Sequence, residues 1–454
     1  MKRVFGSFRD ISGTVYEDGD RIVRAVNQVY GDHFTRLIES GLRDELVARR
    51  YLVPFEEIAP VEGAWKSIAT PRIPFISYPF EWCFSQLRDA AILTLQVQIE
   101  ALKRDMILKD ASSFNVAFIG SQPVFIDCLS FETWNEGAPW KGYHQFCSHF
   151  LAPLLLMARV DKSLHSLLRV HIDGVPLGLA SRMLPKSSWL SPLALFHIHA
   201  HAWAQRRYSD APASAAKASR VRVTKTYLEG LAEQLISALS RLSPSGGKTT
   251  WGDYYSACNY TDDATREKLR IVGDVTRRIG PGVVLDLGAN DGTYSRVARQ
   301  HATTVISSDF DEDAIERNYA IGRKEKLTDV YPMVLDLANP GSGIGWAGRE
   351  RAAFNDRVHA DLVLALALIH HLVISANVPM PMVADEFARL GSAVLVEFVP
   401  PDDEQVRKLT AMRAIGPEAY SLQAFIASFE KHFDQVERWT IPNSERTLHL
   451  LKRR

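Results

Sequence analysis

The fold of the C-terminal half is decided by residues 283–293, which read VVLDLGANDGT. A Val/Leu-rich run typical of a buried strand leads directly into a turn that contains Gly288 and Gly292. Glycines between a strand and a helix let the backbone approach a ligand closely. Asp286 stands just before the turn, where its charge would repel a pyrophosphate and attract a ligand with a cationic group. The stretch therefore predicts a ligand site at the carboxyl end of a sheet strand.

Further strands of the same kind follow at regular intervals and alternate with helical patterns. Near-continuous Val/Ile/Leu runs separated by helices are typical of a parallel sheet that is covered on both faces. The last two runs are separated only by PNSE, which predicts an antiparallel hairpin. We therefore predict an α/β domain with a Rossmann-like, seven-stranded, doubly wound sheet and a terminal hairpin. Its strands are expected at 283–288, 304–310, 330–337, 361–368, 392–399, 434–441 and 446–451.

The turn DLGANDG resembles motif I of class I S-adenosylmethionine-dependent methyltransferases, which is usually written D-x-G-x-G-x-G. The resemblance covers roughly residues 255–454 and includes the strand count and the hairpin; nodulation-type bacterial methyltransferases look similar overall. Asn290 replaces the middle glycine, and Asn tolerates positive φ better than most residues. The resemblance implies S-adenosyl-L-methionine as cofactor, with Asp286, Gly288 and Gly292 beside its methionine part.

Polar residues also stand at the ends of the next strands. Asp309 ends the second strand, where a carboxylate can accept hydrogen bonds from both hydroxyls of a ribose. Asp336 and Leu337 end the third strand, where the resemblance implies contacts near the adenine, and Ala365 lies at the same edge on the fourth. Acidic residues at successive strand ends are more specific than a glycine turn alone. Alternatively, they cap helices in an unrelated Rossmann-like domain.

Three residues are candidates for catalysis: His370 and His371 after the fourth strand, and Glu397 in the fifth. Histidine titrates near neutral pH and can serve as a general base or orient the methyl acceptor. Alternatively, these histidines pack under the cofactor, because methyl transfer needs mainly proximity and alignment. The aromatic-rich segment 251–260 either folds over the cofactor or fills a gap between the two halves.

The N-terminal half contains a second set of polar residues, Asp110, Asn115 and Asp127, around a predicted hairpin of strands 116–120 and 124–127. This segment resembles the catalytic segment of protein-kinase-like and aminoglycoside-phosphotransferase-like folds. The resemblance implies that the first Asp orients an acceptor hydroxyl, while the Asn and the second Asp hold magnesium on ATP. An α+β domain is expected, with a hairpin at 13–26, a hinge strand at 72–82 and a helix at 88–108.

The segment departs from the kinase-like pattern at several places. Leu-Lys precedes Asp110, and Cys128-Leu129 follows Asp127 in place of Phe-Gly. The sequence contains no clear glycine-rich loop, and Arg24 stands where a strand lysine is expected. A degenerate domain that binds the substrate or a partner is therefore favoured over active phosphoryl transfer.

Composition limits the class of protein. The 454 residues suggest two or three domains, and 53 basic against 53 acidic residues give no global attraction to nucleic acid or to an anionic membrane. The four cysteines form no CxxC pair, so neither a disulfide scaffold nor a metal site is expected. The absence of an apolar leader and of a membrane-spanning stretch favours a cytoplasmic protein.

Two further patterns have structural and functional interpretations. The alternating His197, His199 and His201 could bind zinc on a strand, but a structural role is favoured because no fourth ligand is nearby. A basic stretch around the linker is interpreted as solvated charge, although nucleic-acid contact is conceivable. This stretch contains Arg206, Arg207, Lys217, Arg220, Arg222 and Lys225.

Together these patterns predict an N-terminal accessory domain at 1–208, a linker with one helix at 209–250, and a methyltransferase domain at 251–454. The expected function is methyl transfer to a small-molecule or saccharide acceptor, whose binding the N-terminal domain assists. One alternative is a bifunctional kinase–methyltransferase acting on a polysaccharide or glycolipid end. Another is a non-catalytic binding protein with a nucleotide fold.

Overall fold

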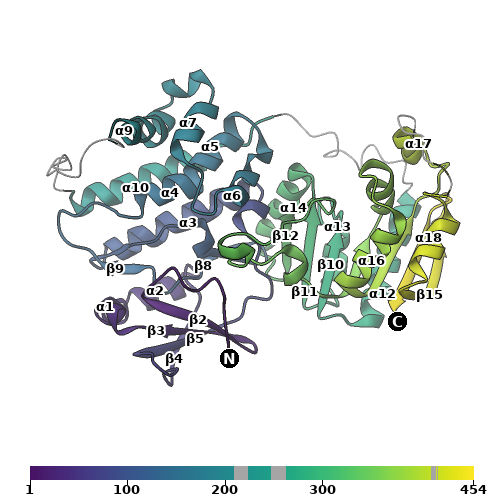
Figure 1. Cartoon of the computed structure of the whole chain (residues 1–454), viewed down its shortest axis with the longest axis horizontal. Coiled ribbons are helices and arrows are strands. Elements are labelled where there is room, and N and C mark those ends of the chain that lie inside the picture. Colours follow the sequence, from purple (N-terminus) through teal and green to yellow (C-terminus); the bar gives the residue numbers. More distant parts are fainter. Residues whose placement is uncertain (209–222, 247–261, 411–415, 417) are drawn as a thin grey trace. The chain divides into compact units, whose positions relative to one another are not determined.

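A computed structural model describes residues 1–208, 223–246, 262–410, 416 and 418–454. The aromatic-rich segment 251–260 and most of the predicted linker lie outside the described residues. The chain forms two compact units (Figure 1). The first unit contains residues 1–119, 123–247 and 343–351, and the second contains residues 120–122, 248–342 and 352–454.

The second unit is built on the predicted seven-stranded sheet (Figure 1). Its strand order is β12-β11-β10-β13-β14-β16-β15, in which the first five strands are parallel and the last two form an antiparallel hairpin. The prediction of seven strands with a terminal hairpin is therefore confirmed. The strands are β10 (Val283–Leu287), β11 (Thr304–Asp309), β12 (Val330–Val334), β13 (Ala360–Ala365), β14 (Gly391–Phe398), β15 (Phe433–Thr440) and β16 (Thr447–Arg453).

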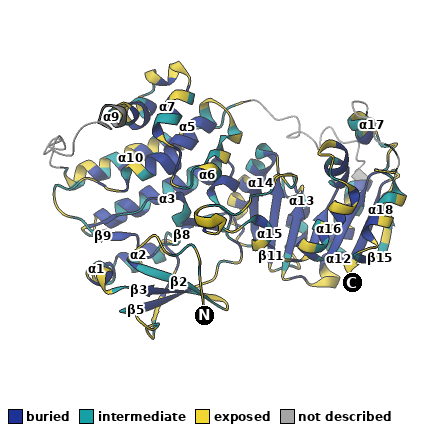
Figure 2. Cartoon of the chain, in the orientation of Figure 1, coloured by how far each residue is buried: buried dark blue, intermediate teal, exposed yellow. Residues whose placement is uncertain are grey.

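Burial explains why these apolar runs form a parallel sheet. Every residue of β11 and β12 is buried, so side chains on both faces of these strands are covered (Figure 2). The apolar stripe of α12 packs with β10, β11 and β13 in one core. The helices of this unit are α12 (Asp262–Ile279), α13 (Thr293–Ala298), α14 (Glu312–Glu325), α15 (Phe354–Arg357), α16 (Met380–Leu390), α17 (Glu404–Thr410) and α18 (Leu422–Phe429).

The first unit begins with an antiparallel sheet of order β1-β2-β3-β5-β4. The predicted hairpin is confirmed as β2 and β3, and two helices follow it before the sheet resumes. The expected hinge strand at 72–82 is wrong, because this proline-containing segment has a single short 3-10 turn at Pro79–Glu81. The elements are β1 (Lys2–Arg3), β2 (Gly13–Asp18), β3 (Arg21–Val26), α1 (Gly31–Glu39), α2 (Leu42–Ala48), β4 (Glu56–Ile58) and β5 (Lys66–Pro71).

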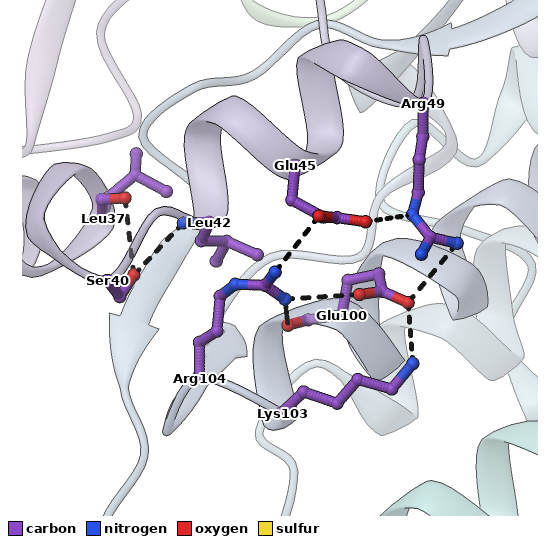
Figure 3. Close-up of polar contacts among 8 residues, drawn as sticks. All are labelled: Leu37, Ser40, Leu42, Glu45, Arg49, Glu100, Lys103 and Arg104. Atoms are coloured by element: carbon purple, nitrogen blue, oxygen red, sulfur yellow. Dashed lines mark hydrogen bonds and ion pairs between the residues drawn. The ribbon is translucent and has the colours of Figure 1, made fainter.

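Ionic contacts tie α2 to the long helix α3 (Phe84–Leu102) (Figure 3). The Glu100 carboxylate is buried and lies 2.8 Å from Lys103, 3.3 Å from Arg104 and 3.8 Å from Arg49. Glu45 of α2 pairs with Arg49 and Arg104. Burial alone would raise the pKa of Glu100, but the surrounding cations lower it below its ordinary value. Between α1 and α2, the Ser40 hydroxyl contacts the Leu37 carbonyl and the Leu42 amide.

The helix expected at 88–108 ends at Leu102, because the chain turns at Asp105 with φ +58°. Residues 106–108 instead form β6, which pairs with β9 (Phe131–Thr133). The predicted hairpin near 116–127 is present as β7 (Val116–Ile119) and β8 (Gln122–Phe125). Residues 120–122, which are the turn of this hairpin and the first residue of β8, belong to the second unit.

The rest of the first unit is helical. The one helix expected within the 209–250 linker is present as α10 (Lys225–Ser240). It packs on α3, buries Leu228, Leu235 and Leu239, and belongs to the first unit (Figure 1). The helical elements between β9 and α10 are α4 (Tyr143–Phe146), η4 (Cys147–Leu151), α5 (Ala152–Arg159), η5 (Lys162–Ser166), α6 (Leu167–Val170), α7 (Leu177–Met183), η6 (Lys186–Leu190), α8 (Pro192–Ala194), η7 (Leu195–His199) and α9 (Ala200–Tyr208). Within the described ranges, no helix is long and apolar enough to cross a bilayer.

Candidate functional site

The second unit contains a cavity of about 380 Å³ at the carboxyl ends of β10 to β13. Ligands of open α/β sheets bind at this edge, because the loops after the strands converge there. The described lining residues are Lys268, Leu287, Gly288, Asn290, Tyr294, Ser308, Asp309, Phe310, Leu335, Asp336, Leu337, Ala338, Leu366, Ala367, Leu368, His371, Leu372, Ser375 and Ala376. Five residues predicted from the sequence to bind the cofactor are among them: Gly288, Asn290, Asp309, Asp336 and Leu337.

The turn after β10 forms one wall of this cavity. Gly288, Asn290 and Gly292 have φ values of +72°, +50° and +77°. Asn290 therefore takes the positive φ that the sequence suggested it could tolerate. The amides of Gly288 and Ala289 each donate to the Ser308 carbonyl at 2.9 Å, which holds the turn against the end of β11.

Asp309, the last residue of β11, lines the cavity next to the turn. One carboxylate oxygen accepts the Asn290 amide at 2.8 Å, and the other accepts the Asp311 amide at 3.0 Å. Burial raises the pKa of Asp309 to about 6. The next residue, Phe310, also lines the cavity and is 53% exposed, so an aromatic face and a carboxylate stand side by side. An aromatic ring of this kind can stack on a nucleobase.

Asp286 and Gly292 lie beneath the turn and are not among the described lining residues. The buried Asp286 carboxylate accepts the Ser295 hydroxyl at 2.6 Å. Gly292 is the N-cap of α13 and lies directly beside the buried Asn318. Ala365 is also buried and does not line the cavity, whereas the next three residues, Leu366, Ala367 and Leu368, do. Asp286, Gly292 and Ala365 therefore support the residues that line the cavity without lining it themselves. The spacing along the sequence did not show this difference.

The acidity of Asp286 gives a test of this arrangement. Replacing Asp286 by asparagine is expected to raise the free energy of unfolding at pH 8 by about 1–3 kcal/mol. Burial raises the pKa of Asp286 from 3.8 to about 7. Because the folded-state pKa is the higher one, the carboxylate costs stability above about pH 7, and this cost disappears as the pH falls toward about 4.

Chemical denaturation of wild type and variant at pH 5 and pH 8 measures this effect. The gain from the asparagine should be present at pH 8 and small at pH 5. An equal effect of the substitution at both pH values would contradict the buried, weakly acidic Asp286.

The two histidines differ in position. His371 lines the cavity, whereas His370 is fully buried, with its ring 4.1 Å from that of His371. Neither ring nitrogen of His370 has a hydrogen-bond partner among the described residues. Burial lowers the pKa of His371 to about 4 and that of His370 well below its ordinary value, so both rings are neutral at pH 7. Of the two, His371 is placed to face a ligand.

Glu397 does not face the cavity. Its carboxylate is fully buried, with one oxygen 2.7 Å from Lys268 Nζ and the other 3.6 Å from Arg446. Arg446 in turn contacts Asp403 at 2.8 Å. The geometry therefore gives Glu397 a structural place in a buried ion-pair cluster, in contrast to the catalytic role predicted from the sequence.

Sequence reasoning missed Lys268, which links this cluster to the cavity wall. The signal was present, because Lys268 interrupts the buried apolar stripe of α12 formed by Ala264, Ile271, Val272 and Val275. A lysine at such a position is rarely buried without a paired carboxylate. Its ammonium also lies 5.1 Å from the centre of the Tyr294 ring, which lines the same cavity.

In the first unit, the structure brings Asp110, Asn115 and Asp127 together through Ser130. The Asn115 amide donates to the Asp110 carbonyl at 3.5 Å and to the Ser130 hydroxyl at 3.2 Å. Ser130 donates to Asp127 at 2.5 Å. Burial raises the pKa of Asp110, and the nearby Asp127 charge adds to this rise. Arg24 of β3 donates to the Ile126 carbonyl, just before Asp127.

Residues 343–351 also belong to the first unit. The buried Glu350 carboxylate accepts two hydrogen bonds from Arg9, at 2.5 and 2.9 Å. The Arg351 guanidinium lies 4.5 Å from the centre of the Phe114 ring, within the loop that runs from Asp110 to Asn115. The contact of this late segment with the 110–115 loop had no signal in the sequence.

The described residues contain no group of histidine, cysteine, aspartate or glutamate side chains suited to a metal ion. His197 and His199 lie in a helical segment and not on a strand, so the alternation considered for a zinc site is absent. The Tyr143 hydroxyl bonds His197, while Ser181 and Ser188 bond the two ring nitrogens of His199 at 2.8 Å.

Comparison with known proteins identifies relatives of this chain. No family model matches it. The N-methyltransferase NodS from Bradyrhizobium japonicum WM9, in complex with S-adenosyl-l-homocysteine, is 13% identical over 45% of this chain and 99% of that chain, with a TM-score of 0.33. WbdD is 18% identical over 48% and 46% of the two chains, with a TM-score of 0.31. These structural likenesses are too low to assign a function.

The sequence relative is much nearer. The nodulation protein NoeA of Rhizobium meliloti (strain 1021) is 35% identical over 461 aligned positions, which cover 99% of this chain and 96% of the relative. Identity at this level over nearly the whole of both chains shows common descent, and the chain belongs to the family of the nodulation protein NoeA.

Proposed function

We propose that the second unit is a class I S-adenosylmethionine-dependent methyltransferase. The observation that carries the proposal is that the Gly288–Asn290 turn, the Asp309 carboxylate and the Phe310 ring line the same cavity. A volume of about 380 Å³ lies within the range of small-molecule sites, roughly 300–1,000 Å³. The strand order and the terminal hairpin agree with the fold that the motif implies.

The residues present fit this cofactor. Asp309 would accept hydrogen bonds from the ribose hydroxyls, and Phe310 would stack on the adenine. A side chain at Gly288 would point toward Leu368, 3.3 Å away, so the glycine keeps the wall open for a close backbone approach. When bound, S-adenosylmethionine supplies a sulfonium-activated methyl group for an in-line displacement, which depends mainly on alignment.

The acceptor is proposed to be a small molecule or a saccharide, with the first unit assisting its binding. His371, Leu372, Ser375 and Ala376 line the part of the cavity contributed by the segment after β13. His371, whose ring is neutral at pH 7, would accept a proton from the acceptor or orient it. A His371→Ala variant that keeps cofactor affinity but loses turnover would support this role.

Asp309→Ala tests the cofactor site. The substitution is expected to weaken S-adenosylhomocysteine binding by about 5- to 150-fold, or about 1–3 kcal/mol, because hydrogen bonds to a charged acceptor are lost. Isothermal titration calorimetry of the full chain measures this change. Asp311→Ala is the matched control: Asp311 caps α14 outside the cavity, so its loss should lower stability by about 1 kcal/mol and leave affinity unchanged.

Failure of the wild-type protein to bind S-adenosylmethionine or S-adenosylhomocysteine would overturn the methyltransferase proposal. That result would favour a non-catalytic protein that keeps the nucleotide fold as a scaffold. Equal affinity losses in Asp309→Ala and Asp311→Ala would instead reject the ribose assignment of Asp309.

A bifunctional kinase–methyltransferase is the second candidate. The observation that favours it is the Ser130-linked arrangement of Asp110, Asn115 and Asp127, together with the sheet order β1-β2-β3-β5-β4. ATP turnover that is abolished by Asp127→Ala would support phosphoryl transfer. Wild-type protein without ATP turnover would leave the first unit as an acceptor- or partner-binding domain.

A further inference from the structure

The helical segment 192–208 of the first unit exposes apolar side chains along one face. The exposed positions among its first twelve residues are Pro192, Phe196, Ala200 and Trp203, which follow helical spacing. Phe196 is 61% exposed and Trp203 is 55% exposed. A helix at a protein surface normally turns its polar face outward, so this face has the opposite pattern.

The preceding turn η6 extends this apolar face. The Trp189 indole is 52% exposed and stacks on His199, with ring centres 4.2 Å apart and planes 6° from parallel. His199 lies three residues after Phe196 and four before Trp203, which is the spacing of residues on one helix face. The Trp189 indole that covers His199 therefore lies on the same face as Phe196. Leu190 is 88% exposed. We call Trp189, Leu190 and Phe196 the aromatic patch.

The charge around the aromatic patch is of one sign. Residues 174–208 contain four Arg or Lys residues and no Asp or Glu, although the whole chain has equal numbers of both signs. Arg182 and Lys186, just before the patch, are exposed. Arg182 lies in the last turn of α7, and this helix packs against α9 (Figure 1).

We propose that the aromatic patch docks the protein on an anionic lipid surface. Tryptophan is enriched at membrane–water interfaces, and an apolar helix face flanked by Lys and Arg is typical of segments that lie in the headgroup region. Each cation near an anionic membrane adds a favourable electrostatic contribution to binding. A symmetric contact between two copies would place the Arg182 and Lys186 sites of both copies together, which opposes self-association.

Vesicle flotation of the full chain tests the proposal. Wild-type protein should float with vesicles of phosphatidylcholine containing roughly 30% phosphatidylglycerol, and much less with phosphatidylcholine alone. Leu190→Glu with Phe196→Glu should weaken partitioning at least about tenfold, because two apolar contacts become repulsive charges. Both side chains are exposed, so circular dichroism melting curves should match those of the wild type.

Met382→Glu with Val436→Glu is the matched control, since both side chains are similarly exposed on the second unit and add the same charge. This control should float like the wild type. Absence of flotation with anionic vesicles, or equal loss in both double variants, would overturn the proposal. A wild-type dimer that the patch variant converts to a monomer, without any vesicle binding, would assign the patch to a protein interface and also overturn it.

The test is independent of the methyltransferase proposal. S-adenosylhomocysteine affinity of the patch variant should equal that of the wild type, because the patch and the cavity belong to different compact units. Intact flotation with absent cofactor binding would reject the proposed function alone, and the reverse result would reject only the membrane surface.

Discussion

Lys268→Met is expected to lower the free energy of unfolding of the second unit by about 3–5 kcal/mol, because it leaves the Glu397 carboxylate short of its nearest cation. Lys268 Nζ lies 2.7 Å from Glu397 and both side chains are buried, whereas Arg446 lies farther away at 3.6 Å. Removing one partner of a buried pair costs the desolvation of the remaining charge. Few single substitutions in this unit should cost as much.

Denaturation of the full chain, with hydrogen exchange of the β10–β14 amides as the local readout, measures the loss. Lys268→Met combined with Glu397→Gln should recover much of the stability, because no buried charge is then left without its partner. Arg270→Ala on the same helix is the control. It removes the exposed ion pair between Arg270 and Asp274, which contributes about 0–1 kcal/mol to the free energy of unfolding. A loss below about 1 kcal/mol for Lys268→Met would show that the pair is solvated.

Gly292→Ala is expected to destabilise the second unit by about 2–4 kcal/mol and to abolish measurable cofactor binding. Gly292 has φ +77°, and a Cβ there would lie 2.4 Å from the Asn318 side-chain oxygen. Asn318 is buried and donates to the Ser307 hydroxyl at 2.7 Å, so it cannot move aside without losing that bond. To relieve the collision, the turn from Gly288 to Gly292 would have to move, and this turn forms one wall of the cavity.

Gly280→Ala separates backbone strain from this collision. Gly280 has φ +59°, but a Cβ there meets nothing within 4 Å, so only the left-handed strain of about 1–2 kcal/mol applies. Thermal unfolding and calorimetric titration of both variants are the measurements. Equal destabilisation by the two substitutions would show that the contact with Asn318 does not constrain the turn.

Much of the second unit's fold was accessible from the sequence. The runs around Val284 and Leu364 are apolar at nearly every position, because their strands are covered on both faces, and such runs predict a buried parallel sheet. The PNSE connection predicted the final hairpin for a similarly local reason. In the first unit, local patterns predicted the β2–β3 hairpin but misplaced the end of α3, where positive φ at Asp105 reverses the chain.

The candidate site was only partly predictable. Gly288, Asn290 and Asp309 were expected at the rim, because parallel strands place their carboxyl ends at one edge, and the structure places all three on the cavity. Asp286 was expected there too, but the alternation of side chains along β10 turns it toward Ser295. Glu397 was expected to face the ligand, and Lys268, 129 residues earlier, holds it in the core.

The sequence by itself determined the order of strands and helices in the second unit and the residues at the strand ends, because both follow from periodicities shorter than one element. Only the tertiary structure decided which charges pair in the core, which segment joins which unit, and which face of a helix stays exposed. Glu350 thus meets Arg9 across 341 residues, and Phe196 and Trp203, with the spacing of a buried stripe, lie on the surface. Such outcomes depend on which distant surfaces meet, and a pattern along one segment carries no information about its partner.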